Sequence, residues 1–281
     1  MGTIFEILIA DQEAGYAAQA SQAVFREVDR LEALFSRFNT TSEIGQINRL
    51  RAGESVRNGL DTFECLKVAA KVQRETAGAF DVNFRLSKGS AEAAEFELSA
   101  AQSGYTIRRR PDFLGHSVPG LDLDLGAIGK GYALDKAASL LTDWSIDRFL
   151  IHGGTSTALA AGDAPGLRPG EAGWPVGVGG SWELPGVPKR VLLRDRALSG
   201  SGTEVKGPHI RDPRTGRPAE GHLASWVSHP SAAVSDALST AFMSMKPKEV
   251  RRYCERHPEV WTLLVTPKNR ILLLNPEKLA A

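Results

Sequence analysis

The stretch from residue 121 to residue 141, LDLDLGAIGKGYALDKAASLL, is the most informative part of this sequence. Alternating leucines from Leu121 to Leu125 predict a short strand, and the run that ends at Leu141 predicts a helix after a glycine-bearing turn. Strand, glycine turn and helix in this order place helix N-terminal amides where they can meet an anion. Glycines allow close approach of a ligand and Lys130 can neutralise a phosphate, but an ordinary tight turn with a surface lysine is the alternative interpretation.

The sequence before this stretch predicts one strand and two helices. Residues 3–10 form an apolar run, and residues 14–38 carry apolar side chains at helical spacing among charged ones. A polar segment, NTTSEIGQIN, separates this helix from a second one that begins at Asp61, with Glu64 in capping-box position and Gly78 placed to end it. Residues 85–120 are less regular and are interpreted as a variable, shortened excursion.

The sequence after Arg148 predicts short strands followed by helices. Apolar runs such as FLIHGG, TALAAG and KRVLLRD alternate with glycines, as in hairpins. Helices are expected over residues 231–245 and 247–257, and a final strand pair around VWTLLV and RILLL. Helices and strands are mixed without regular βαβ alternation, which favours an α+β fold. No linker divides the chain, so residues 1–281 are expected to form a single domain.

Composition narrows the class of protein. The chain has 281 residues, a formal net charge of +1 and 42% hydrophobic residues, which fits a globular enzyme and gives no basic excess for nucleic acid or an anionic membrane. No run approaches the roughly 18 apolar residues of a membrane span, and the N-terminus lacks a signal-peptide pattern, so a soluble cytoplasmic protein is expected. Cys65 and Cys254 match no metal or redox spacing and are expected to be buried or half-buried thiols.

Two further segments carry candidate chemistry. In PHIRDPRTGRP, residues 208–218, His209 is a candidate general base, although the same letters describe a polar turn with its own Asx hydrogen bonds. In SAAVSDALSTAFMSM, residues 231–245, an apolar face leaves Asp236 and Thr240 one turn apart on the opposite side. A carboxylate and a hydroxyl so placed suit Mg²⁺, whereas the alternative is simply the polar face of a helix.

Six segments in this order resemble the ApbE family of FAD:protein FMN transferases over nearly the whole chain. They are MGT at residues 1–3, LFSRFNTTSEIGQIN at 34–48, ETAGAFD at 75–81, DLGAIGKGYALD at 124–135, HIRDPRTGRP at 209–218 and SDALSTA at 235–241.

The resemblance implies site residues and a reaction. Asp236 and Thr240 would bind Mg²⁺ through their side chains, and Ala127 through its backbone carbonyl. The residues implied to line the FAD site are Met1, Phe38, Ala79, Phe80, Asp81, Asp124, Lys130 and Ile210. A Ser or Thr hydroxyl of an acceptor protein would attack the FMN-side phosphorus of FAD and release AMP, with His209 as base and Lys130 neutralising charge.

Alternatives and departures accompany this hypothesis. Water in place of the acceptor hydroxyl would make the chain an FAD pyrophosphatase that yields FMN and AMP, and a relative with an incomplete pocket would be a non-catalytic flavin-binding protein. Phe38 stands where the family usually has tyrosine, Thr155 where it has an acidic or amide residue, and VNFRLSKGSAEAAEF replaces the family's turn after GAFD.

Overall fold

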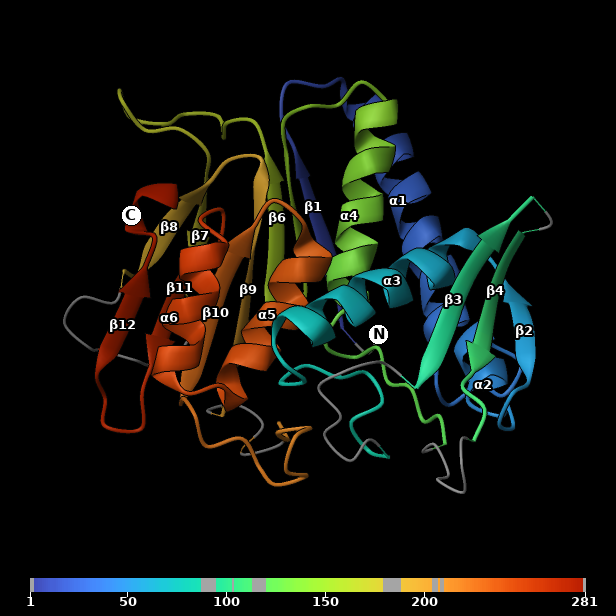
Figure 1. Cartoon of the computed structure of the whole chain (residues 1–281). Helices are drawn as coiled ribbons and strands as arrows, with labels where there is room; N and C mark the ends of the chain where they lie inside the picture. Colours follow the sequence, from blue (N-terminus) through green and yellow to red (C-terminus); the bar gives the residue numbers. More distant parts are fainter. Residues whose placement is uncertain are drawn as a thin grey trace.

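A seven-stranded antiparallel sheet forms the centre of the molecule (Figure 1). The computed structural model describes residues 3–86, 95–102, 104–112, 120–178, 188–203, 207 and 210–279. In spatial order the seven strands are β1 (Phe5–Ile9), β5 (Phe149–Gly153), β6 (Thr157–Ala161), β9 (Arg196–Gly202), β10 (Ala224–His229), β11 (Trp261–Val265) and β12 (Ile271–Leu274).

Helices cover one face of this sheet, and a two-stranded hairpin covers the other. The helices are α1 (Ala14–Phe35), α2 (Glu43–Ile47), α3 (Leu60–Glu75), α4 (Gly129–Asp143), α5 (Ala232–Ser244) and α6 (Pro247–Arg256), with a 3₁₀ turn η1 (Pro276–Lys278). Apolar residues of α1 and α4 pack on β5 and β6, while α5 lies over β9 and β10. On the opposite face, Trp174 and Val176 of β7 (Trp174–Gly177) and Val191 of β8 (Arg190–Leu193) pack on the sheet.

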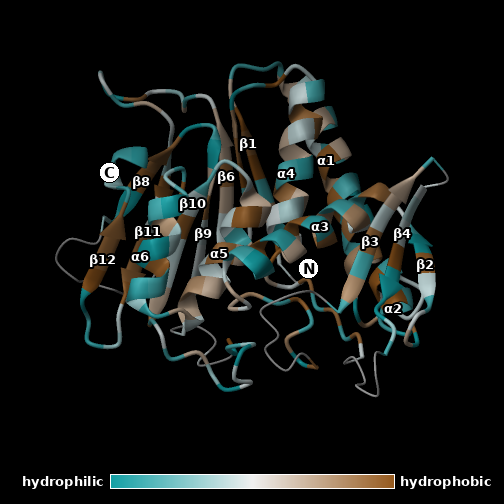
Figure 2. Ribbon diagram, viewed as in Figure 1, coloured by the Kyte–Doolittle hydropathy of each residue, from teal (hydrophilic) through white to brown (hydrophobic). Residues whose placement is uncertain are grey.

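The fold is therefore α+β, as the sequence predicts, and several elements match closely. The helices expected over residues 231–245 and 247–257 are α5 and α6, and the helix expected to end at Leu141 is α4. In Figure 2 the α6 helix is largely hydrophilic where it faces the viewer, whereas the strands β11 and β12 beside it are hydrophobic. The helix buries only Val250, Tyr253 and Cys254, so most of its side chains meet solvent. Both cysteines are buried and free.

A three-stranded sheet includes part of residues 85–120, the segment whose sequence pattern predicts a less regular excursion. Strands β3 (Phe96–Ala101) and β4 (Gly104–Arg109) pair with each other, and β4 also pairs with β2 (Ser55–Asn58). Phe96 and Ile107 anchor this sheet in the main core. The polar segment before it contains α2, whose first turn is capped by the Ser42 hydroxyl.

The predicted start of the second long helix is wrong in its capping. The helix α3 begins at Leu60 with Gly59 as N-cap and without a side-chain cap. Asp61 instead accepts hydrogen bonds from Arg30, Lys136 and Tyr132, so its carboxylate serves contacts with α1 and α4. The expected stop is confirmed, since Gly78 has φ +76° and its amide reaches back to the Gln73 carbonyl.

The strand expected from Leu121 to Leu125 is also wrong. The three leucines are buried as the alternation predicts, but the segment pairs with no strand in the described chain. Its backbone amides and carbonyls instead form hydrogen bonds with the side-chain amides of Asn48 and Asn83. Across the described residues, we find no helix whose length and hydropathy would let it cross a bilayer.

Candidate functional site

Asp236 lies where α4 and α5 meet, and it is more buried than the sequence suggested. Its side chain is 5% exposed, so the residue does not belong to a solvated helix face. The Lys130 ammonium donates to the carboxylate at 3.2 and 3.4 Å, the Gly131 amide donates at 3.2 Å and the Thr157 hydroxyl at 3.4 Å. Donors from the sheet and from α4 thus hold one carboxylate in place.

Gly131 allows the two helices to approach closely enough for this contact. A Cβ atom at this position would lie 2.2 Å from the Ala232 carbonyl oxygen of α5. The glycine of the GKG sequence is therefore needed for helix packing, while the adjacent Lys130 turns back to donate to the Gly126 carbonyl at 3.1 Å. The glycine turn positions both the lysine and the first turn of α4 against Asp236.

The three predicted metal ligands offer hard oxygens in this region. In a regular helix the Gly131 amide would donate to the Ala127 carbonyl four residues earlier, but here it donates to Asp236. Within the described residues no other backbone amide donates to the Ala127 carbonyl. The Thr240 hydroxyl, one turn along α5 from Asp236, lies 3.3 Å from the Ser201 hydroxyl of β9. One carboxylate, one hydroxyl and one carbonyl fit Mg²⁺, which keeps waters and substrate oxygens in its shell.

The acidic content of this site is low. Within the described ranges, no group of three or more His, Cys, Asp or Glu side chains could hold a metal ion. A metal at Asp236 would therefore depend on hydroxyl, carbonyl and substrate ligands, which is usual for Mg²⁺ bound with phosphates and unlike a site built wholly from protein carboxylates.

Asp124 belongs to a cluster of two carboxylates and two guanidinium groups. Arg85 donates to Asp124 at 2.8 Å and lies 3.5 Å from Asp122, while Arg37 lies 3.5 Å from Asp122 and 3.7 Å from Asp124. The other Asp124 oxygen accepts the Gly126 amide at 2.9 Å. Gly126 therefore links the Asp124 cluster to Lys130 and Asp236.

The predicted FAD-lining residues 79–81 follow the end of α3 and are buried. Ala79 and Phe80 are 2% and 3% exposed and belong to the main core, which leaves their backbone as the part able to meet a ligand. The Asp81 carboxylate accepts the Asn83 amide at 2.7 Å in an Asx turn. The Ala79 carbonyl accepts the Ser244 hydroxyl, which connects this turn to the end of α5.

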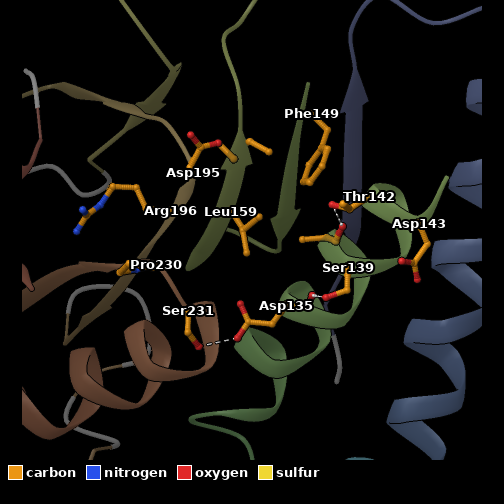
Figure 3. A pocket seen from close by; sticks show the side chains of 13 residues that line it. Asp135, Ser139, Thr142, Asp143, Phe149, Leu159, Asp195, Arg196, Pro230 and Ser231 are labelled. Carbon is orange, nitrogen blue, oxygen red and sulfur yellow. Dashed lines mark hydrogen bonds between the residues drawn. The ribbon is translucent and has the colours of Figure 1, made fainter. Parts of the chain in front are cut away.

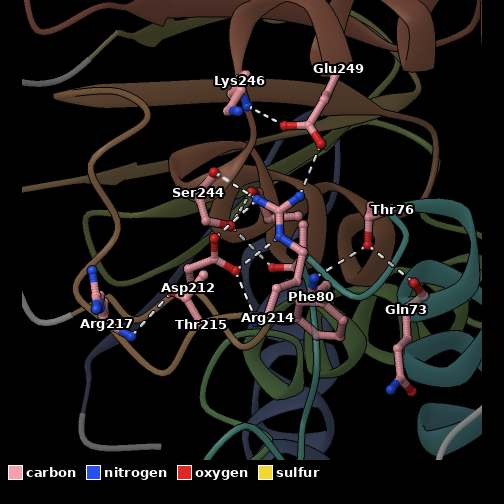
Figure 4. A network of polar contacts seen from close by, with 12 residues as sticks. Gln73, Thr76, Phe80, Asp212, Arg214, Thr215, Arg217, Ser244, Lys246 and Glu249 are labelled. Carbon is pink, nitrogen blue, oxygen red and sulfur yellow. Dashed lines mark hydrogen bonds and ion pairs between the residues drawn. The ribbon is translucent and has the colours of Figure 1, made fainter. Parts of the chain in front are cut away.

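Arg214 joins the loop that follows His209 to α5 and α6 through hydrogen bonds (Figure 4). Its guanidinium donates to both Asp212 oxygens at 3.0 Å, to Glu249 of α6 at 3.0 Å and to the Ser244 carbonyl of α5 at 2.9 Å. The Asp212 carboxylate beside it raises the pKa of Arg214. The loop is thus a structured turn held at the junction of α5 and α6.

The remaining predicted residues differ in how they are placed. Ile210 is half-buried and its carbonyl accepts the Ala219 amide across the loop. Phe38 is 85% exposed, with the Arg37 guanidinium 4.8 Å from its ring centroid. Its ring therefore offers an open stacking surface. Met1 and His209 lie outside the described residues.

Asp135, the last residue of the DLGAIGKGYALD motif, caps α5. Its carboxylate accepts the Ser231 hydroxyl and the Ala232 and Ala233 amides at 2.7 to 3.0 Å. Burial raises its pKa, and these donors oppose the rise. The residue also borders a hollow between α4 and the sheet, where Phe149 and Leu159 contribute apolar walls (Figure 3). Asp135 therefore aligns α5 and with it Asp236.

Sequence reasoning missed several polar residues that shape the site. Thr157 and Ser201 are near Asp236 and Thr240 only because β6 and β9 pass under α5, which no local pattern reveals. Asn48 lies at the end of the LFSRFNTTSEIGQIN segment, and Asn83 and Arg85 fall in the segment that departs from the family pattern.

Comparison with known proteins finds a matching family and several relatives of this chain. The model of the ApbE family matches residues 1–264. The FAD:protein FMN transferase of Salmonella typhimurium (strain LT2) is 24% identical over 282 residues, which cover 90% of this chain and 79% of that protein. The protein of the same name from Vibrio cholerae is 27% identical over 276 residues, covering 87% and 79%.

Solved structures share the fold. The Pseudomonas stutzeri flavinyl transferase ApbE in its apo form has a TM-score of 0.77 at 20% identity and covers 100% of this chain and 95% of its own. The ApbE protein of Thermotoga maritima has a TM-score of 0.78 at 22% identity, covering 99% and 95%. With a family match over nearly the whole length and the same arrangement of helices and strands, the chain belongs to the ApbE family.

Proposed function

We propose that this protein is a Mg²⁺-dependent FAD:protein FMN transferase that attaches FMN from FAD to a Ser or Thr hydroxyl of an acceptor protein. The observation that carries the proposal is the junction of α4 and α5, where Lys130 donates both to Asp236 and to the Gly126 carbonyl of the glycine turn that contains Ala127. The names of the related proteins, all FAD:protein FMN transferases, support the same reaction.

Each group of site residues has its own role in this proposed reaction. Lys130 neutralises charge on the pyrophosphate, and its contact with the Gly126 carbonyl keeps the ammonium at the turn. Asp236, Thr240 and the Ala127 carbonyl would hold the cation, which would supply charge neutralisation at the phosphorus. Asp81, Asp124 and the exposed ring of Phe38 orient FAD, together with the backbone of Ala79, Phe80 and Ile210 and with Met1. His209 accepts the proton of the attacking hydroxyl.

The balance of the step is simple. The acceptor oxygen forms a bond to the FMN-side phosphorus, the pyrophosphate bond to AMP breaks, and the hydroxyl proton goes to the base. Water in the acceptor position would give free FMN and AMP instead. The fate of FMN therefore separates transfer from hydrolysis.

The test uses the purified chain with FAD and Mg²⁺, with and without EDTA, and with a Ser/Thr-bearing acceptor protein taken from a flavinylated system. We expect AMP release that EDTA abolishes, and FMN that stays with the acceptor after denaturation. Metal-dependent AMP with FMN only in solution would assign the chain to hydrolysis. A chain that neither binds FAD nor releases AMP would contradict the proposal.

A further inference from the structure

The segment that leads into the glycine turn is held by two asparagine side chains. The Asn48 amide nitrogen donates to the Leu123 carbonyl at 3.2 Å while its oxygen accepts the Leu123 amide at 2.7 Å. Asn83 donates to the Gly120 carbonyl at 2.9 Å and accepts the Asp122 amide at 2.7 Å. Each side-chain amide therefore satisfies one backbone donor and one backbone acceptor, as a neighbouring strand would.

These contacts connect parts of the chain that lie far apart in sequence. Asn48 is the C-cap residue of α2, beside the three-stranded sheet, and Asn83 is fully buried after the end of α3. The Asn83 backbone amide also donates to Asp81, and the Val82 carbonyl accepts the Asp124 amide at 2.8 Å. The two segments proposed to line the FAD site are thereby fixed to each other.

We propose that Asn48 and Asn83 are positioning residues for FAD, acting through Asp124 and the Gly126 turn rather than by touching the substrate. Their four hydrogen bonds set where Asp124 lies, and Asp124 in turn accepts the Gly126 amide that precedes Lys130. Displacement of this segment moves the Asp124 carboxylate and the lysine-bearing turn together. The inference rests on the proposed function, because it assumes that FAD binds at Asp124.

The chain provides a matched control for the experiment. Asn275 also donates its side-chain amide to backbone carbonyls, those of Val260 at 2.7 Å, Cys254 at 3.3 Å and His257 at 3.4 Å, but it joins α6 to β11 and β12. Replacing asparagine by aspartate at any of the three positions keeps the shape and turns the amide donor into an oxygen that faces a carbonyl. All three variants should lose stability, while only two disturb the Asp124 segment.

The measurement is FAD binding by flavin fluorescence and AMP release on the full chain, for Asn48→Asp, Asn83→Asp and Asn275→Asp. We expect kcat/KM for FAD to fall roughly 10- to 100-fold in the first two variants, because small displacements of positioned groups have effects of this size. The fall should lie mainly in KM. Asn275→Asp should keep the wild-type KM at a comparable loss of thermal stability.

A second readout separates positioning from general damage. A protonated aspartate can donate again to the carbonyl, so Asn48→Asp should recover FAD affinity relative to wild type as the pH is lowered. Asn48 is half-buried and keeps the test open if Asn83→Asp does not fold. Equal KM values in all three variants would overturn the inference while leaving the proposed function intact. A wild-type chain that neither binds FAD nor releases AMP would overturn the proposed function itself.

Discussion

Asp236 is the residue at which structure and sequence pattern give different expectations. The helical pattern places it on a solvated face, where its removal would leave the fold unchanged. In the folded chain its carboxylate is buried and paired with Lys130. We therefore expect Asp236→Asn to abolish metal-dependent AMP release and also to lower the free energy of unfolding by about 3 kcal/mol, because Lys130 loses its charged partner. Urea unfolding measured beside the activity assay tests both parts.

The control for this prediction is Asp143→Asn, which removes an exposed carboxylate at the end of α4. It should change neither the free energy of unfolding nor AMP release. If Asp236→Asn lost activity at wild-type stability, the carboxylate would be solvated in the folded protein, as the sequence pattern alone suggested.

His229 makes stability depend on pH at the residue scale. Its Nδ1 atom accepts the Ser231 amide at 2.9 Å, and burial lowers its pKa from 6.5 to about 4. As the pH falls, His229 is therefore protonated in the unfolded chain before it is protonated in the folded chain. Its contribution to the free energy of unfolding is complete above pH 6.5 and is lost as the pH falls toward 4. The span corresponds to about 3 kcal/mol.

The measurement is the free energy of unfolding between pH 7 and pH 4 for wild type and His229→Asn, which can still accept the Ser231 amide. The variant should show a flatter decline with falling pH. His152 and His222 also have lowered pKa values and retain part of the slope in both proteins. Identical slopes would mean that His229 is protonated equally in the folded and unfolded states.

At the scale of elements, the contact between α4 and α5 depends on Gly131. In an unconstrained helix, alanine is more favourable than glycine by about 1 kcal/mol. Here a Cβ atom would meet the Ala232 carbonyl oxygen at 2.2 Å. We expect Gly131→Ala to destabilise the chain by about 2 kcal/mol or more and to reduce FAD turnover, because α5 must move and carries Asp236 with it.

Gly177→Ala is the matched substitution, since its Cβ would find only the Lys189 carbonyl, 4.0 Å away. Thermal unfolding and AMP release should be close to wild type in this variant. A stabilised Gly131→Ala protein would show that the helices separate without cost and that the close approach is not required for the site.

The elements also show where sequence patterns suffice. The sequence predicts α5 and α6 correctly, because each has a continuous helical pattern and the backbone hydrogen bonds of a helix are local. The run of Leu121, Leu123 and Leu125 gave the correct buried positions but the wrong partner, because side-chain amides and strands satisfy the same backbone groups. Asp61 and Glu64 have capping-box spacing, yet ion pairs with other helices determine where Asp61 points. Such competition depends on tertiary contacts.

At the scale of the whole molecule, the candidate site is assembled from segments that are distant in sequence. Six ordered motifs indicate the family and predict two metal ligands on α5, a prediction that the structure does not test, whereas Thr157 and Ser201 are found only once β6 and β9 are placed beneath that helix. Lys130 and Asp236 are separated by 106 residues and meet only in the folded chain. A ligand that binds both must therefore stabilise the fold as a whole.

This linkage gives a prediction for thermal unfolding. A ligand that binds only the folded chain stabilises it by about 2.7 kcal/mol at 100 times its dissociation constant. We expect FAD with Mg²⁺ to raise the unfolding midpoint of wild type in one cooperative transition, and EDTA to remove the part that depends on the metal. Asp236→Asn should keep some response to FAD through Asp124 and lose the further gain from Mg²⁺. Asn275→Asp, although less stable, should show the full wild-type gain, because its substitution does not touch the site. An equal magnesium-dependent gain in Asp236→Asn would place the cation elsewhere in the protein.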